Sequence, residues 1–340
     1  MSGSSPLHFA LAWLLPLMIG ALAWHRPWMA AAAMLAWQVA LALAERVPAW
    51  QHSAPPVARS VGGFRWVVRA HVPLQAAVLA LGLVVVGREG QDWGAALLLG
   101  LAIGGVTGAQ GITFAHELGH SRSRADRLLA WALMASVNYS HFMVEHYRGH
   151  HRRAATAADP ASARRGESLW RFLPRTLAGS WASAWKLEAQ DLQNLGRGWL
   201  RSPLAWALAL QGAWAAVLTV FWGPLALLFW VVQSVYAVYL LETINYIEHY
   251  GLERRSAAGR PEPFGVGHAW NADHRLTNWL TANLQRHSDH HLHAWKPYPT
   301  LAALPGPQLP TGYAGCLFLA PVPALWFRLM HPRLAALSRA

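Results

Sequence analysis

Six apolar stretches, each close to the length that a helix needs to cross a bilayer, constrain this chain most. They lie at 8–24, 28–44, 70–87, 93–115, 203–223 and 224–241, and none contains Asp, Glu, Lys or Arg. A transmembrane helix needs about 20 mainly apolar residues. The composition agrees, because 54% of the residues are hydrophobic and only 13% are charged. We therefore predict an all-α integral membrane protein with six transmembrane helices in one domain, residues 1–340.

The basic residues are distributed unevenly between the connections. The connections that follow the first, third and fifth spans contain only two basic residues, Arg26 and Arg88. The other 26 Lys and Arg residues lie at 46–69, 122–201 and 254–339. The positive-inside tendency places those regions, and both termini, on the cytoplasmic side of a bacterial-type inner membrane. The net charge of +12 then reflects orientation, and no nucleic-acid partner is needed to explain it. The cytoplasmic segments 116–202 and 242–312 are the candidates for a functional cap.

Nine of the 18 histidines lie in four groups within these two segments. They are His116 and His120 in HELGH, His146, His150 and His151 in EHYRGHH, His249 in NYIEHYG, and His287, His290 and His291 in LQRHSDHH. Residues i and i+4 share a helix face, so His146 and His150 are expected to reach one metal ion, and His151 a second one. Nine imidazoles are too many for one ion, which predicts two. Imidazole suits several transition metals, of which we favour iron.

Other polar residues fit supporting roles around such a centre. Four carboxylates adjoin the histidine groups and could accept the free ring N–H of a ligand, or bridge the metals: Glu117, Glu145, Glu248 and Asp289. His141 and His293 lie within a few residues of a group. The lone cysteine, Cys316, excludes an internal disulfide or a cysteine-ligated centre in this chain. Electrons for a redox reaction would therefore come from another protein.

Two other classes of function fit parts of the pattern. HELGH matches the H-E-x-x-H motif of zinc proteases, which supplies two ligands and a general base, but a protease leaves the other histidine groups unexplained. A metal transporter also uses histidines within a membrane. Transport sites, however, lie near the bilayer midplane on broken helices, whereas these groups follow the cytoplasmic ends of the spans.

Together the four motifs resemble those of the integral-membrane alkane hydroxylases, the di-iron alkane 1-monooxygenases, which are related to membrane fatty-acid desaturases and xylene monooxygenase. The resemblance covers residues 100 to 300 or so. It includes HFMVEHYRGHH with the following ATAADPASARRGESLW (155–170), and HAWN (268–271) ahead of the last histidine group. NYIEHYG distinguishes this family from ordinary desaturases. One stretch departs from the family pattern, LHAWKPYPT (292–300), where His293 could have an added role.

The resemblance implies that the nine histidines bind two iron ions (Fe²⁺/Fe³⁺), with O2 as co-substrate, and that the enzyme hydroxylates the terminal carbon of an alkane. It also implies electrons from a rubredoxin, reduced by a rubredoxin reductase. Basic residues beside the motifs could guide such an acidic donor: Arg122, Arg124, Arg148, Arg152, Arg153, Arg164 and Arg165. Methyl hydroxylation of alkyl-aromatics and fatty-acyl desaturation are the alternatives at the same type of site.

An alkane offers no charge or hydrogen bond, so its recognition rests on burial of apolar surface, at about 0.8 kcal/mol per CH2. We expect a channel between the membrane helices that takes the substrate from the surrounding lipids. The run GLAIGGVTGAQG (100–111), which leads to His116, is a candidate for its lining. Close helix packing is the other interpretation of such glycines. Substrate length and oligomeric state are left open by the sequence.

Overall fold

A computed structural model describes the chain except for residues 1–3, 54, 57–60, 89–91, 258–259 and 338–340. Those outside it include both terminal tips and part of the third connection, whose sidedness was predicted above. Within the described residues, six helical segments are long and apolar enough to cross a membrane. The segments are α1 (Pro6–Ala10) with η1 (Leu11–Trp13) and α2 (Leu14–His25); α3 (Pro27–Ala44); α4 (Gly62–Val86); α5 (Trp93–Val106) with η3 (Thr107–Ile112) and α6 (Thr113–Gly119); α11 (Pro203–Val217) with η6 (Leu218–Trp222); and α12 (Pro224–His249).

The remaining elements are short, apart from α7, α10 and α16. They are η2 (Pro48–Trp50), α7 (Arg124–Ser136), α8 (Phe142–Val144), η4 (Glu145–His150), α9 (His151–Arg153), α10 (Leu169–Asn194), η5 (Trp199–Arg201), β1 (Ser256–Ala257), β2 (Arg260–Pro261), η7 (Val266–His268), α13 (Arg275–Leu280), α14 (His287–Leu292), η8 (Tyr298–Thr300), α15 (Tyr313–Leu319) and α16 (Pro323–Leu337). The strands β1 and β2 form an antiparallel pair. The predicted all-α fold with six spans is thus confirmed, with this pair as a small addition.

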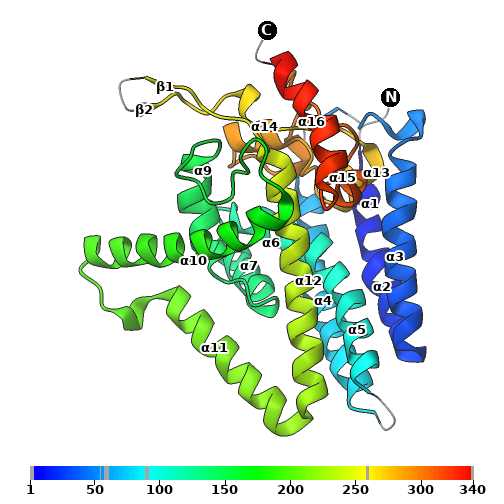
Figure 1. Ribbon diagram of the computed structural model, residues 1–340. Helices are drawn as coiled ribbons and strands as arrows, with labels where there is room; N and C mark the ends of the chain where they lie inside the picture. Colours follow the sequence, from blue (N-terminus) through cyan, green and yellow to red (C-terminus); the bar gives the residue numbers. More distant parts are fainter. Residues whose placement is uncertain (1–3, 54, 57–60, 89–91, 258–259, 338–340) are drawn as a thin grey trace.

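The elements are arranged as a bundle of membrane helices with a cap at one end (Figure 1). Helices α2, α3, α4, α5 and α12 form the bundle, and α9, α14, α15 and α16 lie at its upper end in that view. Helix α10 runs crosswise to the bundle, and α11 returns at a slant to meet α12 at the far end. The first and last described helices, α1 and α16, both lie toward the capped end.

Three of the spans extend at least four residues past their uncharged stretches, and these are α4, α12 and the span that ends in α6. Helix α4 begins at Gly62 rather than near 70, and its Arg69 guanidinium lies 2.7 Å from the carboxylate of Asp126 on α7. Helix α12 continues past 241 to His249. Its buried Glu242 accepts hydrogen bonds from the Tyr139 hydroxyl at 2.7 Å and the Thr176 hydroxyl at 2.9 Å. Because these partners pair with the charged side chains, both helices continue past the charged residues into the cap.

The glycine run between 100 and 111 packs α5 and η3 directly on α12. A Cβ atom on Gly104 would lie 2.7 Å from the carbonyl oxygen of Gln233, and one on Gly108 would lie 2.8 Å from the Cα of Ala237. A side chain larger than hydrogen would push the helices apart at both positions. Gly108 also lines an apolar cavity that extends to His116 and His146, so the run serves both close packing and the lining of that cavity. This contact fixes α6, and with it HELGH, against α12.

Candidate metal centre

The first two histidines are placed by the span that ends in α6. His116 lies on α6, and His120 directly follows its last residue. The π-helical turn η3, which precedes α6, adds a residue to the helix and so rotates the segment after it. The two rings meet edge to face with centroids 4.9 Å apart. HELGH therefore presents both imidazoles on one side of the chain, as its i, i+4 spacing predicts.

The second motif is also π-helical, and this changes how its histidines are divided. In η4 the backbone winds with i→i+5 hydrogen bonds, so residues five apart share a face. The Nε2 atoms of His146 and His151 accordingly lie 3.0 Å apart. The expectation that His146 pairs with His150, with His151 on the other metal, is corrected. It assumed an α-helix, whereas the wider turn sends His150 to the opposite side.

The last two motifs complete the arrangement from two further elements. His249 is the last residue of α12, and α14 carries His287, His290 and His291. The Nε2 atom of His287 lies 3.3 Å from that of His249 and 3.0 Å from that of His291. His290 points the other way, with its Nε2 atom 3.3 Å from that of His151.

The nine histidines form two groups. Within each group, the ligand atoms all lie within 4.8 Å of one another. Group A consists of His116, His120, His146, His151 and His290, and group B of His150, His249, His287 and His291. Two nitrogens bound to one ion at about 2.1 Å lie roughly 3.0–3.4 Å apart, which matches the separations above. The Nε2 atoms of His116 and His150 are buried and have no hydrogen-bond partner. Both groups therefore fit a metal ion in number, spacing and donor type.

Burial favours the neutral, metal-binding form of most of these imidazoles. Removal from water lowers the pKa of His146 well below its usual value, and the neighbouring histidines of both groups lower it further. The pKa values of His120, His151, His287, His290 and His291 are lowered well below the usual range in the same way. His150 differs. Burial lowers its pKa, but the charge and hydrogen bond of Asp159 outweigh this, so that the pKa is raised.

The oxygen atoms nearest to the Nδ1 atoms of three histidines belong to residues that the sequence predicted only in part. The Nδ1 atom of His150 is hydrogen-bonded to the Asp159 carboxylate at 2.9 Å. The Nδ1 atom of His287 lies 3.1 Å from a Glu248 oxygen, but it makes no hydrogen bond there. The Nδ1 atom of His249 lies 3.2 Å from the carbonyl oxygen of His268. Asp159 was missed in the sequence, although it stands in ATAADP only nine residues after His150.

The expected role of the three other carboxylates is corrected. Glu145 pairs with Arg153 at 2.6 Å, and Glu117 accepts a hydrogen bond from the backbone N–H of Tyr298 at 3.2 Å. Asp289 binds Lys296 at 2.9 Å and His293 at 2.6 Å. Glu145 and Asp289 are engaged within their own segments, whereas the partner of Glu117 lies 181 positions away in the sequence. Among the described residues, none of the three has a hydrogen bond to a histidine of group A or B. His293 thus contacts Asp289 rather than a metal group.

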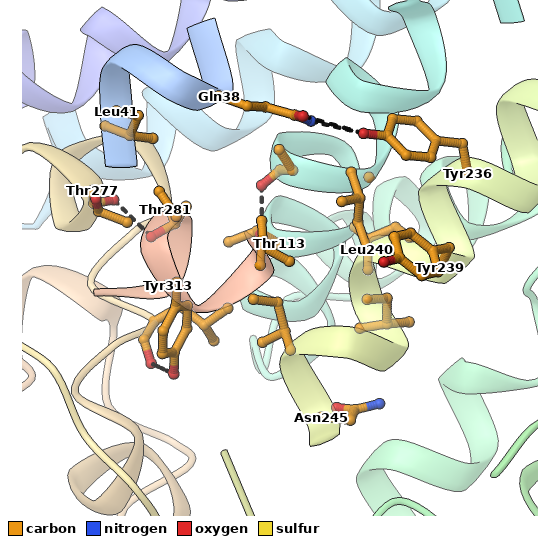
Figure 2. A pocket seen from close by; sticks show the side chains of 18 of the residues that line it. Gln38, Leu41, Thr113, Tyr236, Tyr239, Leu240, Asn245, Thr277, Thr281 and Tyr313 are labelled. Carbon is orange, nitrogen blue, oxygen red and sulfur yellow. Dashed lines mark hydrogen bonds between the residues drawn. The ribbon is translucent and has the colours of Figure 1, made fainter. Parts of the chain in front are cut away.

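An apolar cavity of about 420 Å³ reaches the two groups from the membrane side. His116, His146 and His287 line it at one end, together with Glu248. Several of its polar lining residues bond to protein atoms (Figure 2). The Thr113 hydroxyl, for example, donates to the carbonyl oxygen of Ala109 at 2.9 Å, and the Tyr313 hydroxyl donates to Glu248 at 2.6 Å. Such a cavity suits a ligand without polar groups.

A second, more polar cavity of about 320 Å³ approaches group A at His120. Arg65, Arg122 and Lys296 line it, and so does the exposed Trp295. By contrast, two of the arginines expected to guide a donor are engaged internally. Arg153 donates to Glu145 and Ser183, and Arg148 pairs with Glu188 and Asp191.

Comparison with known proteins gives the family. A family model described as fatty acid desaturase matches residues 92–318, which include all nine histidines. Alkane 1-monooxygenase 2 of Pseudomonas aeruginosa is 38% identical over 289 residues, which cover 84% of this chain and 77% of that protein. The chain belongs to the alkane 1-monooxygenase family. The predicted resemblance is thereby confirmed, and the membrane spans fit a membrane-bound oxidoreductase.

Two further relatives show how far the likeness extends. Alkane 1-monooxygenase 1 of Pseudomonas aeruginosa is 42% identical over 253 residues, covering 72% of this chain and 66% of that protein. The xylene/toluene monooxygenase hydroxylase component of Pseudomonas putida is 26% identical over 233 residues, covering 68% of this chain and 62% of that component. The chain therefore spans about two thirds of the length of these two relatives.

Proposed function

We propose that this protein hydroxylates the terminal carbon of alkanes, giving 1-alkanols, with O2 and two iron ions held by groups A and B. The observation that carries the proposal is the apolar cavity that ends at histidines of both groups. When bound there, iron would allow O2 to be reduced with electrons from the donor protein. One oxygen atom would enter a C–H bond and the other would leave as water. The names of the alkane 1-monooxygenase relatives support this choice of substrate.

The chain's own residues would bind the substrate, orient the histidine rings and keep water from the reacting carbon. The apolar lining buries the substrate chain, at about 0.8 kcal/mol per CH2, and keeps water from the reacting carbon. Asp159 orients the ring of His150 through a hydrogen bond, and Glu248 lies 3.1 Å from the His287 ring. A terminal carbon delivered beside His116 and His287 would then react where the two groups meet.

The protease and transporter alternatives fit this arrangement poorly. The Glu117 carboxylate, which would be the general base of H-E-x-x-H, is bound by the backbone of Tyr298. Its two flanking histidines belong to a group of five. Helix α14, which carries three of the nine histidines, also lies at the capped end of the bundle (Figure 1). Methyl hydroxylation of alkyl-aromatics and acyl desaturation use the same type of centre and are separated by product analysis.

Feeding n-alkanes from octane to hexadecane to cells that also express a rubredoxin and its reductase is expected to yield 1-alkanols. The purified protein should hold about two iron ions, one for each histidine group. Iron with only aromatic alcohols or desaturated acyl chains as products would move the substrate to those classes. One zinc ion and no oxidised product would contradict the proposal.

For the electron donor we propose a small acidic rubredoxin that docks at the polar cavity beside His120. Arg65 and the exposed Arg122 place positive charge at this opening, and the exposed ring of Trp295 lies beside it. Lys296 also lines it but pairs with Asp289, and Glu117 and Asp126 are the acidic lining residues. A positive patch steers an acidic partner and orients it. The cavity also brings the surface of the cap close to group A.

Arg122→Glu is expected to raise the KM for the rubredoxin roughly tenfold at low ionic strength, because one attraction becomes a repulsion. The difference should shrink as salt is added, since salt screens exposed charges. Arg152→Glu is the matched control, because it reverses another exposed arginine away from this cavity. Equal effects of the two variants would remove the cavity as the docking site.

A further inference from the structure

The far part of the apolar cavity is crossed by one polar pair. The Gln38 side chain on α3 donates from Nε2 to the hydroxyl of Tyr236 on α12 at 3.0 Å. Both residues line the cavity, and Figure 2 shows their bond at the top of the view, with Asn245 near the bottom. Among the residues that the structure describes, Gln38 and Tyr236 make the only hydrogen-bonded link between α3 and α12.

The pair lies far from the histidine groups. Tyr236 precedes Glu248 by 12 residues on the same helix, which corresponds to about 18 Å of helix rise. It is the lining residue of α12 most distant from the groups along that helix. On α3, Met34 and Leu35 line the cavity about one helical turn beyond Gln38. Apolar lining therefore continues past the pair.

The pair differs from Thr113 and Thr281 in where its bond runs, and it differs from the Tyr313–Glu248 bond in lying at the far end of the cavity. Thr113 and Thr281 donate to carbonyl oxygens of their own segments, so a substrate can pass them without disturbing those bonds. A chain passing between Gln38 and Tyr236 must separate an amide from a hydroxyl in apolar surroundings. That cost is comparable with the gain from burying roughly one to four methylenes.

We propose that the Gln38–Tyr236 hydrogen bond is a bar across the cavity that sets the longest chain the enzyme accepts. The inference rests on the proposed function for the reaction itself. Substrates that end before the bar leave the bond intact. A longer chain must open the bond before it gains contact with Met34 and Leu35. The bar thus makes the length limit sharper than a gradual narrowing would.

The test is the double variant Gln38→Leu/Tyr236→Phe, which removes the bond and leaves neither partner unpaired. Supplied with n-alkanes from octane to tetracosane, it should give at least about tenfold more 1-alkanol from chains above the wild-type limit, relative to the best substrate. Tyr239→Phe is the control, because Tyr239 lines the same cavity and has no bond to Gln38. An unchanged limit in the double variant, or an equal shift in the control, would overturn the bar.

A second measurement needs no catalysis. The Tm of the metal-loaded protein in lipid nanodiscs, without an electron donor, is measured with each alkane, because a ligand that binds the native state stabilises it. We expect stabilisation to end at a certain chain length in the wild type and at a longer one in the double variant. If the wild type makes no alkanol, the proposed function fails, while this shift still supports the bar. The same end point in both proteins overturns the bar.

Discussion

Replacing His249 by alanine is expected to abolish alkanol formation and to lower the bound iron from about two ions per chain to about one. His249 is one of only four histidines in group B, and it is fully buried. The carbonyl oxygen of His268 lies 3.2 Å from its Nδ1 atom and orients the ring. A small movement of a neighbouring side chain therefore cannot supply the same ligand to the metal ion. Three remaining imidazoles would hold the ion weakly.

Metal analysis of the purified variant and product analysis in cells check this expectation together. His331→Ala is the matched control, because His331 contacts Tyr250, the residue after His249, but belongs to neither group. It should retain both ions and most of the activity. A His249→Ala protein with unchanged iron and unchanged alkanol would remove His249 from the ligands.

Asp159→Asn is expected to lower the affinity of group B for its metal ion by about tenfold to a hundredfold. The Asp159 carboxylate lies 2.9 Å from Nδ1 of His150 and accepts a hydrogen bond from the Ser162 hydroxyl at 2.6 Å. Although burial alone would raise it, the pKa of Asp159 is lowered, because His150 and Ser162 favour the charged form. The amide keeps the size but removes the charge that orients the His150 ring.

Chelator competition at fixed pH measures this change in affinity, and the alkanol rate should fall in parallel. Asp92→Asn is the control, because Asp92 caps the N-terminus of α5 and belongs to neither group. Its substitution should leave the metal affinity unchanged. If Asp159→Asn binds metal as tightly as the wild type, then the contact with His150 has no part in ordering group B.

Local properties of the chain were enough to predict the spans and the histidine motifs. Hydrophobic length is a local property, so five of the six starts and four of the six ends of the spans lie within about three residues of their apolar stretches. The exceptions have one cause. Charged side chains such as Arg69 and Glu242 bind partners from distant segments, so the helices that bear them do not end where the apolar residues do.

The sequence by itself determined a six-span membrane protein with nine clustered histidines, because hydrophobic length and residue spacing act between near neighbours. Only the tertiary structure decided how those histidines divide, since a π-helical turn moves His146 next to His151 and sends His150 to group B. It also selected Asp159 and Glu248 over the other carboxylates, and it joined Gln38 to Tyr236 across 198 positions of chain. These contacts depend on how helices from different parts of the chain pack, which no local pattern specifies.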